Sequence, residues 1–350
     1  MTKPILSICI PTYNRGRFAY DAAMYVLSAY KGDDIEVVIS NNCSEDNTEE
    51  LILQINDPRL RYFVNKENLG AAFNTHLTFL RANGRFAYLT SDEDDIDIDQ
   101  IPYLISYFKK NPDTAIFIGG GNLKYTKKRF PDAVYAEPFD ALMAIAFQTR
   151  YMTGLILNQK YYAEKLSDIS YEESPEIWDA YSFMYAMALL CCCGPVVTSS
   201  RLLFKQSRFT MTDISNNARK DGIYYYEPAG RINQMGVWIR TIMGLPLSTV
   251  EKQILVIKIV FDTAMLATRI FTPGYVDEVR KTVPDSDYQI YLERIKKLTV
   301  ENMCNEILSK GNDIYSNLFG SDIYAVEHGQ IREYLDIRSE EIHGRIDGRL

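Results

Sequence analysis

The chain has 350 residues, a formal net charge of −8, and 47% hydrophobic against 24% charged residues. This length allows one large core or two modest domains, and the composition is that of an ordinary soluble globular protein. The acidic balance argues against general nucleic-acid binding, because a phosphate backbone needs a surface rich in Lys and Arg. A single nucleotide can still bind, since a metal and a few local donors are enough.

The N-terminus leads directly into a strand-like segment and lacks the apolar stretch of a signal peptide. The longest apolar run, residues 183–197, is short for a bilayer span and is interrupted at Gly194 and Pro195. We therefore expect a cytoplasmic protein, with peripheral association at the inner face of the membrane left open. The six cysteines form no C-x-x-C pair and the three histidines are scattered, so we expect buried reduced thiols.

The first part of the chain alternates between two hydrophobic patterns. Short apolar runs typical of buried strands occupy residues 5–10, 35–40, 60–64 and 86–90. Helical patterns lie between them at residues 18–30, 46–55 and 71–81. This alternation predicts an α/β domain with a mostly parallel sheet.

Later segments continue this pattern less regularly. Helices are predicted at residues 99–110 and 174–192, and strands at 114–119, 154–157 and 195–204. The run Gly119 to Gly121 lacks the G-x-G-x-x-G spacing and no helix clearly follows it, so we interpret it as a turn rather than a phosphate cradle.

The C-terminal part is dominated by helical periodicity. Residues 247–270 and 287–308 repeat apolar positions at helical spacing. We therefore divide the chain into an α/β domain at residues 1–235 and a C-terminal helical region at residues 236–350.

Polar residues follow three of the predicted strands. They are Pro11-Thr12-Tyr13 after the first strand, Asn41-Asn42 after the second, and Asp92-Glu93-Asp94 after the fourth. Ligands of open α/β sheets bind at the carboxyl ends of strands. We therefore expect these loops to meet at one edge of the sheet and to form a binding site.

The acidic run Asp92 to Asp95 can be explained in two ways. Four neighbouring carboxylates repel one another unless they are solvated or neutralised by a cation. Carboxylate oxygens suit Mg²⁺ or Mn²⁺, and one or two are enough when phosphates supply the other ligands. The alternative is a solvated turn whose acids favour the start of the next helix.

Four segments together resemble the family 2 glycosyltransferases. Residues 6–15 (LSICIPTYNR) are similar to the opening strand of that family, and residues 39–48 (ISNNCSEDNT) to its second nucleotide-binding loop. Residues 68–74 (NLGAAFN) resemble its N-x-G helix start, and residues 87–94 (AYLTSDED) its acidic D-x-D segment. All four occur in the family's order and spacing. A looser resemblance, to bacterial O-antigen and capsule sugar transferases, extends to about residue 245.

This resemblance implies a GT-A, Rossmann-like fold that binds a nucleotide-sugar. Pro11, Thr12 and Tyr13 would line the pocket of the base, followed by Arg15. Position 41 is usually an aspartate that reads the base, and here it is Asn41, whose amide oxygen can accept the same bond without a charge. UDP remains the expected nucleotide, with dTDP next.

The remaining roles on the donor side follow from the same resemblance. Asn68 and Gly70 would lie near the ribose or base. Asp92 would contact the ribose or a metal-bound water, and Asp94 would bind the Mn²⁺ or Mg²⁺ ion that bridges the two phosphates. Because Asp95 is also acidic, the roles given to Asp92 and Asp94 could each belong to the next residue in the chain.

The acceptor side needs a general base, because the attacking hydroxyl must lose its proton. Family 2 enzymes are typically inverting, with a carboxylate base near a helix start in the second half of the domain. Asp179 is our first candidate and Glu176 our second; the family's usual Glu-Asp pair is not cleanly present. The alternative is that these acids only stabilise the start of a helix and have no catalytic role.

The sequence therefore predicts a metal-dependent glycosyltransferase that builds a cell-surface polysaccharide. Its partners would be a nucleotide-sugar donor and a saccharide or lipid-linked saccharide acceptor, with homodimerisation left open. Two rivals are kept. The first is a sugar nucleotidyltransferase, which would need a glycine-rich loop with a basic residue after the first strand; Pro11 to Asn14 do not offer one. The second is a non-catalytic module of the same fold that would bind its ligand or partner without turnover.

Overall fold

The computed structural model describes residues 3–122, 127–128, 130–147, 151–170, 175–178, 182–206, 227–268 and 298–326, with a few isolated positions beyond 288. The chain forms two compact units, Met1–Thr210 and Met211–Leu350. The division expected after residue 235 falls inside the helix Pro228–Gly244; as a division into functional domains it stays a prediction.

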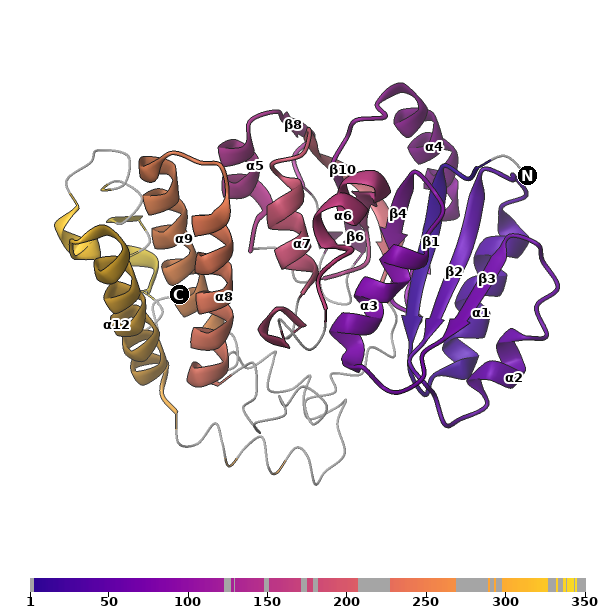
Figure 1. Cartoon of the computed structure of the whole chain (residues 1–350), viewed down its shortest axis with the longest axis horizontal. Coiled ribbons are helices and arrows are strands. Elements are labelled where there is room, and N and C mark those ends of the chain that lie inside the picture. Colours follow the sequence, from indigo (N-terminus) through magenta and orange to yellow (C-terminus); the bar gives the residue numbers. More distant parts are fainter. Residues whose placement is uncertain are drawn as a thin grey trace. The chain divides into compact units, whose positions relative to one another are not determined.

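The first unit is built on a mostly parallel sheet (Figure 1). Its central strand β1 (Leu6–Thr12) pairs in parallel with β2 (Ile35–Asn41) and with β4 (Phe86–Leu89). Strand β3 (Leu60–Val64) pairs in parallel with β2. Each of these strands is a short apolar run, and the predicted α/β fold with a mostly parallel sheet is confirmed.

The sheet continues beyond β4 with strands from later in the chain. The order is β3-β2-β1-β4-β9-β6-β10-β5. Strand β9 (Leu155–Asn158) is antiparallel to both neighbours, whereas β6 (Ile116–Asn122) and β10 (Val196–Lys205) run parallel to each other. The short strand β5 (Asp95–Ile96) pairs with the end of β10. The remaining short strands are β7 (Lys127–Lys128), paired with β6, and β8 (Ala133–Tyr135), paired with β10.

Helices cover both faces of this sheet. Helices α1 (Gly16–Ala29) and α4 (Ile101–Lys110) share one buried apolar cluster with it. Helix α3 (Gly70–Arg81) packs on β1 and β2 and contacts α6 (Gln159–Leu166) and α7 (Phe183–Leu190). Short helices complete the unit: α2 (Thr48–Ile52), η1 (Ile98–Gln100), α5 (Pro138–Ile145) and η2 (Pro175–Trp178).

Strand β1 has apolar side chains toward one face and small polar ones toward the other. Leu6, Ile8 and Ile10 are fully buried in the cluster with α1 and α4. Alternate residues of a strand point to opposite faces, so Ser7 and Cys9 lie on the α3 side, where the Cys9 thiol is 3.9 Å from the Thr78 carbonyl oxygen. Burial raises the pKa of the Cys9 thiol, which is consistent with an unreactive core cysteine.

The three glycines expected to form a turn lie instead inside β6, so that prediction is wrong. A Cβ on Gly119 would lie 2.2 Å from the Leu203 side chain, and one on Gly121 would lie 2.1 Å from the Phe204 ring. The glycines therefore let large side chains of β10 cross the neighbouring strand. Their role is packing, which local sequence signals for turns do not reveal.

The helix expected over residues 174–192 is confirmed only in its second half. Among the residues that the structure describes in this range, Pro175–Trp178 form the 3-10 helix η2 instead of an α-helix, and Phe183–Leu190 form α7. The indole Nε1 of Trp178 donates to the Ser170 carbonyl at 3.2 Å, and its ring packs against Phe73 and His76 of α3. These tertiary contacts hold the η2 turn in place.

Three long helices lie in the described part of the second unit: α8 (Pro228–Gly244), α9 (Thr249–Ala267) and α12 (Val300–Phe319). Helix α9 confirms the expected helix at 247–270 and begins with a capping box between Ser248 and Glu251. The helix expected at 287–308 falls largely outside the described residues. Of the helices that the structure describes, none combines the length and apolar character needed to cross a membrane.

We expect Gly119→Ala to destabilise the first unit, because the added methyl group overlaps the Leu203 side chain. Overpacking of this kind costs about 1–3 kcal/mol, so the urea midpoint followed by circular dichroism should fall. Gly244→Ala is the matched control, since its Cβ would meet nothing within 4 Å. An unchanged midpoint for Gly119→Ala would contradict this packing account.

Candidate nucleotide and metal site

The loops after β1 and β2 are joined at the carboxyl edge of the sheet. Thr12 is in register with Asn41, and the Asn42 N–H donates to the Thr12 carbonyl at 2.9 Å. Asn14 and Cys43 have positive φ values of 52° and 61°, which turn the chain out of each strand. The Asn14 N–H donates to the Ser44 hydroxyl at 2.8 Å, which links the two loops.

The acidic turn after β4 lies against the loop after β1, as predicted. The Thr12 hydroxyl donates to Asp92 at 2.7 Å, and the Arg15 guanidinium donates to the other oxygen of Asp92 at 3.2 Å. Arg15 also lies 3.4 Å from the Glu93 carboxylate. Burial raises the pKa of Asp92, while the Arg15 charge and the Thr12 hydrogen bond oppose that rise.

Asp94 points to a different set of donors. Its side chain is 4% exposed and accepts from the Tyr151 hydroxyl at 2.8 Å and from the Thr153 hydroxyl at 2.6 Å. Thr153 in turn accepts from the Ser91 N–H at 3.0 Å, and the Tyr151 ring stacks on Phe204 of β10 with a centroid separation of 5.2 Å. The segment before β9 therefore holds the acidic turn in position.

The donor set of this turn fits a hard divalent cation. Asp92, Glu93 and Asp94 present carboxylate oxygens within three consecutive residues, and hydroxyl groups orient two of them. Outer contacts of this kind are typical of metal-binding carboxylates. Within the described part of the chain, no three Asp, Glu, His or Cys side chains are gathered as metal ligands. Metal binding by Asp92 and Asp94 therefore stays a prediction, in which phosphates and water would supply the remaining oxygens.

Asn41 is fixed in the loop after β2. It is 1% exposed, its amide nitrogen donates to the Tyr62 hydroxyl at 2.8 Å, and its oxygen accepts from the Ser44 N–H at 2.9 Å. In this structure the Asn41 amide thus supports the loop, and its contact with a base stays a prediction.

Asn68 and Gly70 form the start of α3. The Asn68 side-chain oxygen accepts from the Asn42 amide at 2.7 Å and from the Gly70 N–H at 2.9 Å. Gly70 has φ of 80°, a conformation that residues with a Cβ rarely adopt. The N-x-G segment therefore connects the start of α3 to the loop after β2.

The structure reveals supporting residues that the sequence analysis did not single out. Asn74 on α3 accepts from the Ser40 hydroxyl at 2.6 Å and from the Asn65 amide at 2.9 Å. Asn65 also donates to Asn42 at 2.9 Å and accepts from Arg81 at 2.7 Å. A polar residue on the buried side of an amphipathic helix was the available signal for Asn74. Tyr151 and Thr153 carried no such signal.

The remaining residues expected in the base pocket lie at the open end of β1. Pro11 is half-buried, and Tyr13 is 39% exposed. Tyr13 can therefore present a ring face to a ligand, as the sequence predicts.

The acceptor-side candidates are placed less completely. Asp179 lies outside the described residues. Glu176 lies in η2, whose position is set by the contacts of Trp178 with α3. Trp178 is thus a packing residue with part of its surface still exposed.

Part of the first unit matches known proteins. The family model "Glycosyl transferase family 2" matches residues 7–165. An abequosyltransferase of Salmonella typhimurium, RfbV, is 32% identical over 114 residues, which cover 31% of this chain and 34% of the relative. TuaG of Bacillus subtilis, named for teichuronic acid biosynthesis, is 33% identical over 94 residues, covering 26% of this chain and 37% of the relative. The chain thus spans about a third of the length of these curated relatives.

Solved structures share the fold over nearly the whole chain. TarS residues 1–349 of Staphylococcus aureus, in complex with UDP-GlcNAc, superimposes with a TM-score of 0.59 at 13% identity, covering 92% of this chain and 95% of TarS. The chain therefore has the GT-A fold. Residues 7–165 form a glycosyltransferase family 2 domain, and the resemblance predicted from four short motifs is confirmed.

His76 beside Trp178 predicts a pH dependence of stability. His76 is 2% exposed, its Nδ1 lies 2.8 Å from the Tyr162 hydroxyl, and burial lowers its pKa from 6.5 to about 4. Between these pH values the unfolded chain binds a proton that the folded chain does not. The free energy of unfolding should therefore fall as the pH falls, by up to about 3 kcal/mol at pH 4.

Urea unfolding from pH 7 to 4 measures this effect against a His76→Phe variant, which cannot take up the proton. As the pH drops, the unfolding free energy of the wild type should fall relative to that of the variant. A difference that stays constant over this range would contradict a buried neutral histidine.

Proposed function

We propose that this chain is a metal-dependent, inverting glycosyltransferase. It moves a sugar from a nucleoside-diphosphate sugar to a hydroxyl of a glycan or lipid-linked saccharide in the assembly of a bacterial surface polysaccharide. The names of RfbV and TuaG support this class of pathway. UDP is the proposed nucleotide, because the TarS structure of the same fold holds UDP-GlcNAc.

The observation that carries the proposal is the contact between Thr12 and Asp92. Their 2.7 Å hydrogen bond brings the loop after β1 to the acidic turn after β4. A base beside Tyr13 and a diphosphate beside the carboxylates would then lie along one edge of the sheet. The strand ends of an open α/β sheet are where such ligands bind.

Each residue of the donor side has a chemical task in this proposal. Asp94, and Asp92 with it, would hold Mn²⁺ or Mg²⁺, which supplies charge stabilisation for the departing diphosphate. Tyr151 and Thr153 orient the Asp94 carboxylate through the bonds described above. Arg15 places a positive charge beside Asp92 and Glu93, where it can also attract a phosphate.

The acceptor side must remove a proton from the attacking hydroxyl as the sugar carbon becomes oxocarbenium-like. Asp179 is the proposed general base and Glu176 the second candidate. The two lie three positions apart in the sequence, on either side of Trp178, whose side chain packs against α3.

Two rivals make different predictions. A sugar nucleotidyltransferase would release pyrophosphate from a nucleoside triphosphate and a sugar phosphate. A non-catalytic module would bind a UDP-sugar without turnover. Because the carboxylates at the strand end would bind a ligand in the enzyme and in the module alike, turnover of a UDP-sugar is the property that separates the two.

We expect Asp94→Asn and Asp92→Asn to lower UDP release from UDP-sugars by roughly 10²–10³-fold, the range for loss of a group that stabilises transition-state charge. Thr153→Val should weaken Mn²⁺ binding by roughly 10- to 100-fold, because it removes an orienting bond. Calorimetric titration of Mn²⁺ in the presence of UDP, beside a UDP-release assay, measures both effects.

Asp95→Asn is the matched control, since Asp95 is an exposed carboxylate directly after the same turn. It should keep near-normal turnover and Mn²⁺ affinity. If Asp95→Asn lost turnover while Asp94→Asn kept it, the assignment would shift by one residue. Full turnover in both Asp92→Asn and Asp94→Asn would overturn the donor site.

For the general base, Asp179→Asn should lower sugar transfer by roughly 10²–10⁴-fold while leaving UDP affinity intact. Transfer of labelled sugar to membranes of the producing bacterium, with calorimetry of UDP binding, separates the two. Glu176→Gln serves as the comparison and should cause the smaller loss. The reverse order of effects would make Glu176 the base.

A further inference from the structure

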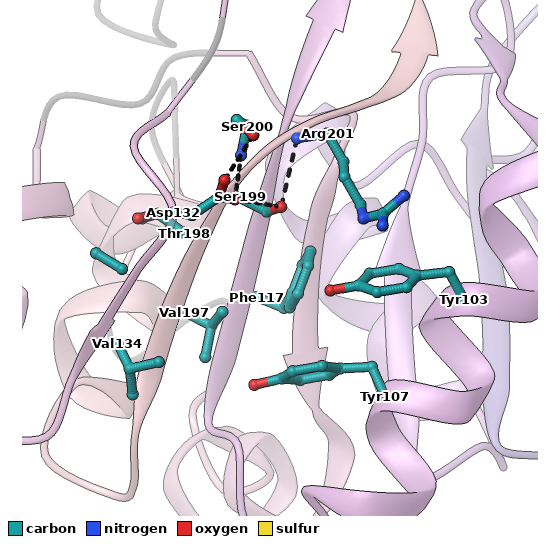
Figure 2. A pocket seen from close by; sticks show the side chains of 11 residues that line it. Tyr103, Tyr107, Phe117, Asp132, Val134, Val197, Thr198, Ser199, Ser200 and Arg201 are labelled. Atoms are coloured by element: carbon teal, nitrogen blue, oxygen red, sulfur yellow. Dashed lines mark hydrogen bonds between the residues drawn. The ribbon is translucent and has the colours of Figure 1, made fainter.

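A groove lies on the first unit away from the acidic turn, along the early half of β10 (Figure 2). Its volume is about 620 Å³, within the range of small-molecule sites. Tyr103 and Tyr107 of α4 form one side, and Val134 of the edge strand β8 lies on the other. Phe117 and Val197 lie between them. Figure 2 shows the hydroxyl ends of Tyr103 and Tyr107 pointing the same way, toward the strands.

The rim of the groove carries an ordered set of polar groups. The exposed Asp132 carboxylate accepts from the Ser199 hydroxyl at 3.0 Å and from the Ser200 hydroxyl at 2.7 Å and N–H at 2.8 Å. These hydrogen bonds lower the pKa of Asp132, so it is charged at neutral pH. The Arg201 guanidinium lies 3.8 Å from the centre of the Tyr103 ring.

The lining chemistry selects a class of ligand. One carboxylate and one guanidinium balance each other, and hydroxyl groups and aromatic rings make up much of the remaining surface. A nucleoside diphosphate would place its negative charges near Asp132. A lipid tail would remove the Asp132 carboxylate and the tyrosine hydroxyls from water without offering them hydrogen bonds. A neutral saccharide offers hydroxyls for the polar rim and C–H surfaces for the tyrosine rings.

The groove is connected to the acidic turn through the fold. Arg201 donates to Gln100 at 3.1 Å, and Gln100 ends η1, which follows β5 and the acidic turn. Along β10, Arg201 and Lys205 are four positions apart, and Lys205 pairs with Asp95. At about 3.3 Å per position they are at most roughly 13 Å apart, a span that a glycan of a few sugar rings can cover.

We propose that this groove binds a neutral oligosaccharide segment of the acceptor, as a second saccharide site separate from the donor site. Its ligand class rests on the proposed function, since a polysaccharide-building enzyme meets a growing glycan. The groove would hold the chain some distance from its reacting end. Binding there would favour longer acceptors over single sugars.

The test is binding of the fluorescently labelled full chain to an array of immobilised bacterial surface polysaccharides with neutral and acidic repeats. We expect retention on neutral polysaccharides that saturating UDP and Mn²⁺ do not displace. Val134→Trp fills the groove from an exposed position, and Arg201→Ala removes the cation at its rim. Each should raise the half-saturating concentration at least about tenfold, which corresponds to about 1.4 kcal/mol.

Arg240→Ala, at an exposed arginine of α8, is the matched control and should bind as the wild type does. The melting temperatures of the three variants show whether each one folds. If one groove variant fails to fold, the other is sufficient for the test. The proposal is overturned if the wild type is retained on no neutral polysaccharide, if a folded groove variant binds normally, or if UDP displaces the glycan. Donor turnover without glycan retention overturns the groove alone, whereas glycan retention without donor turnover overturns the proposed function alone.

Discussion

The burial of the Asp92 carboxylate at the end of a buried strand is the constraint on which the site depends. At 4% exposure this carboxylate needs hydrogen bonds or an opposite charge close by. Thr12 and Arg15 supply both, and they can do so only because β1 and β4 are adjacent and parallel. The pairing of two central strands thus determines which loops form the site.

A second chain of contacts fixes the far side of the acidic turn. Asp94 is bonded to Tyr151 and Thr153, and Tyr151 stacks on Phe204. Phe204 has room for its ring because position 121 is a glycine. Gly121 of β6 therefore helps to position the Asp94 carboxylate through Phe204 and Tyr151. This packing role explains the glycine at position 121, and no phosphate-binding role is needed.

The two sides of the proposed reaction depend on different parts of the first unit. The donor side lies within residues 7–165, where the family 2 domain is matched. The proposed general base lies after that segment, in the part of the chain that begins at η2. The groove draws on both parts, since α4, β6 and β8 lie within residues 7–165 and β10 lies after them.

The sequence by itself determined the strand-helix alternation and the polar loops that meet at one edge of the sheet. Buried parallel strands are continuous apolar runs and their ends are polar, so both are visible in the sequence. The nucleotide-binding roles of Thr12, Asn41 and Asp92 stay predictions. Tertiary structure decided the roles of Gly119, Trp178 and Tyr151. Each acts through a partner distant in the chain, namely Leu203, His76 and Asp94, and contacts between distant residues leave no local pattern of spacing or composition.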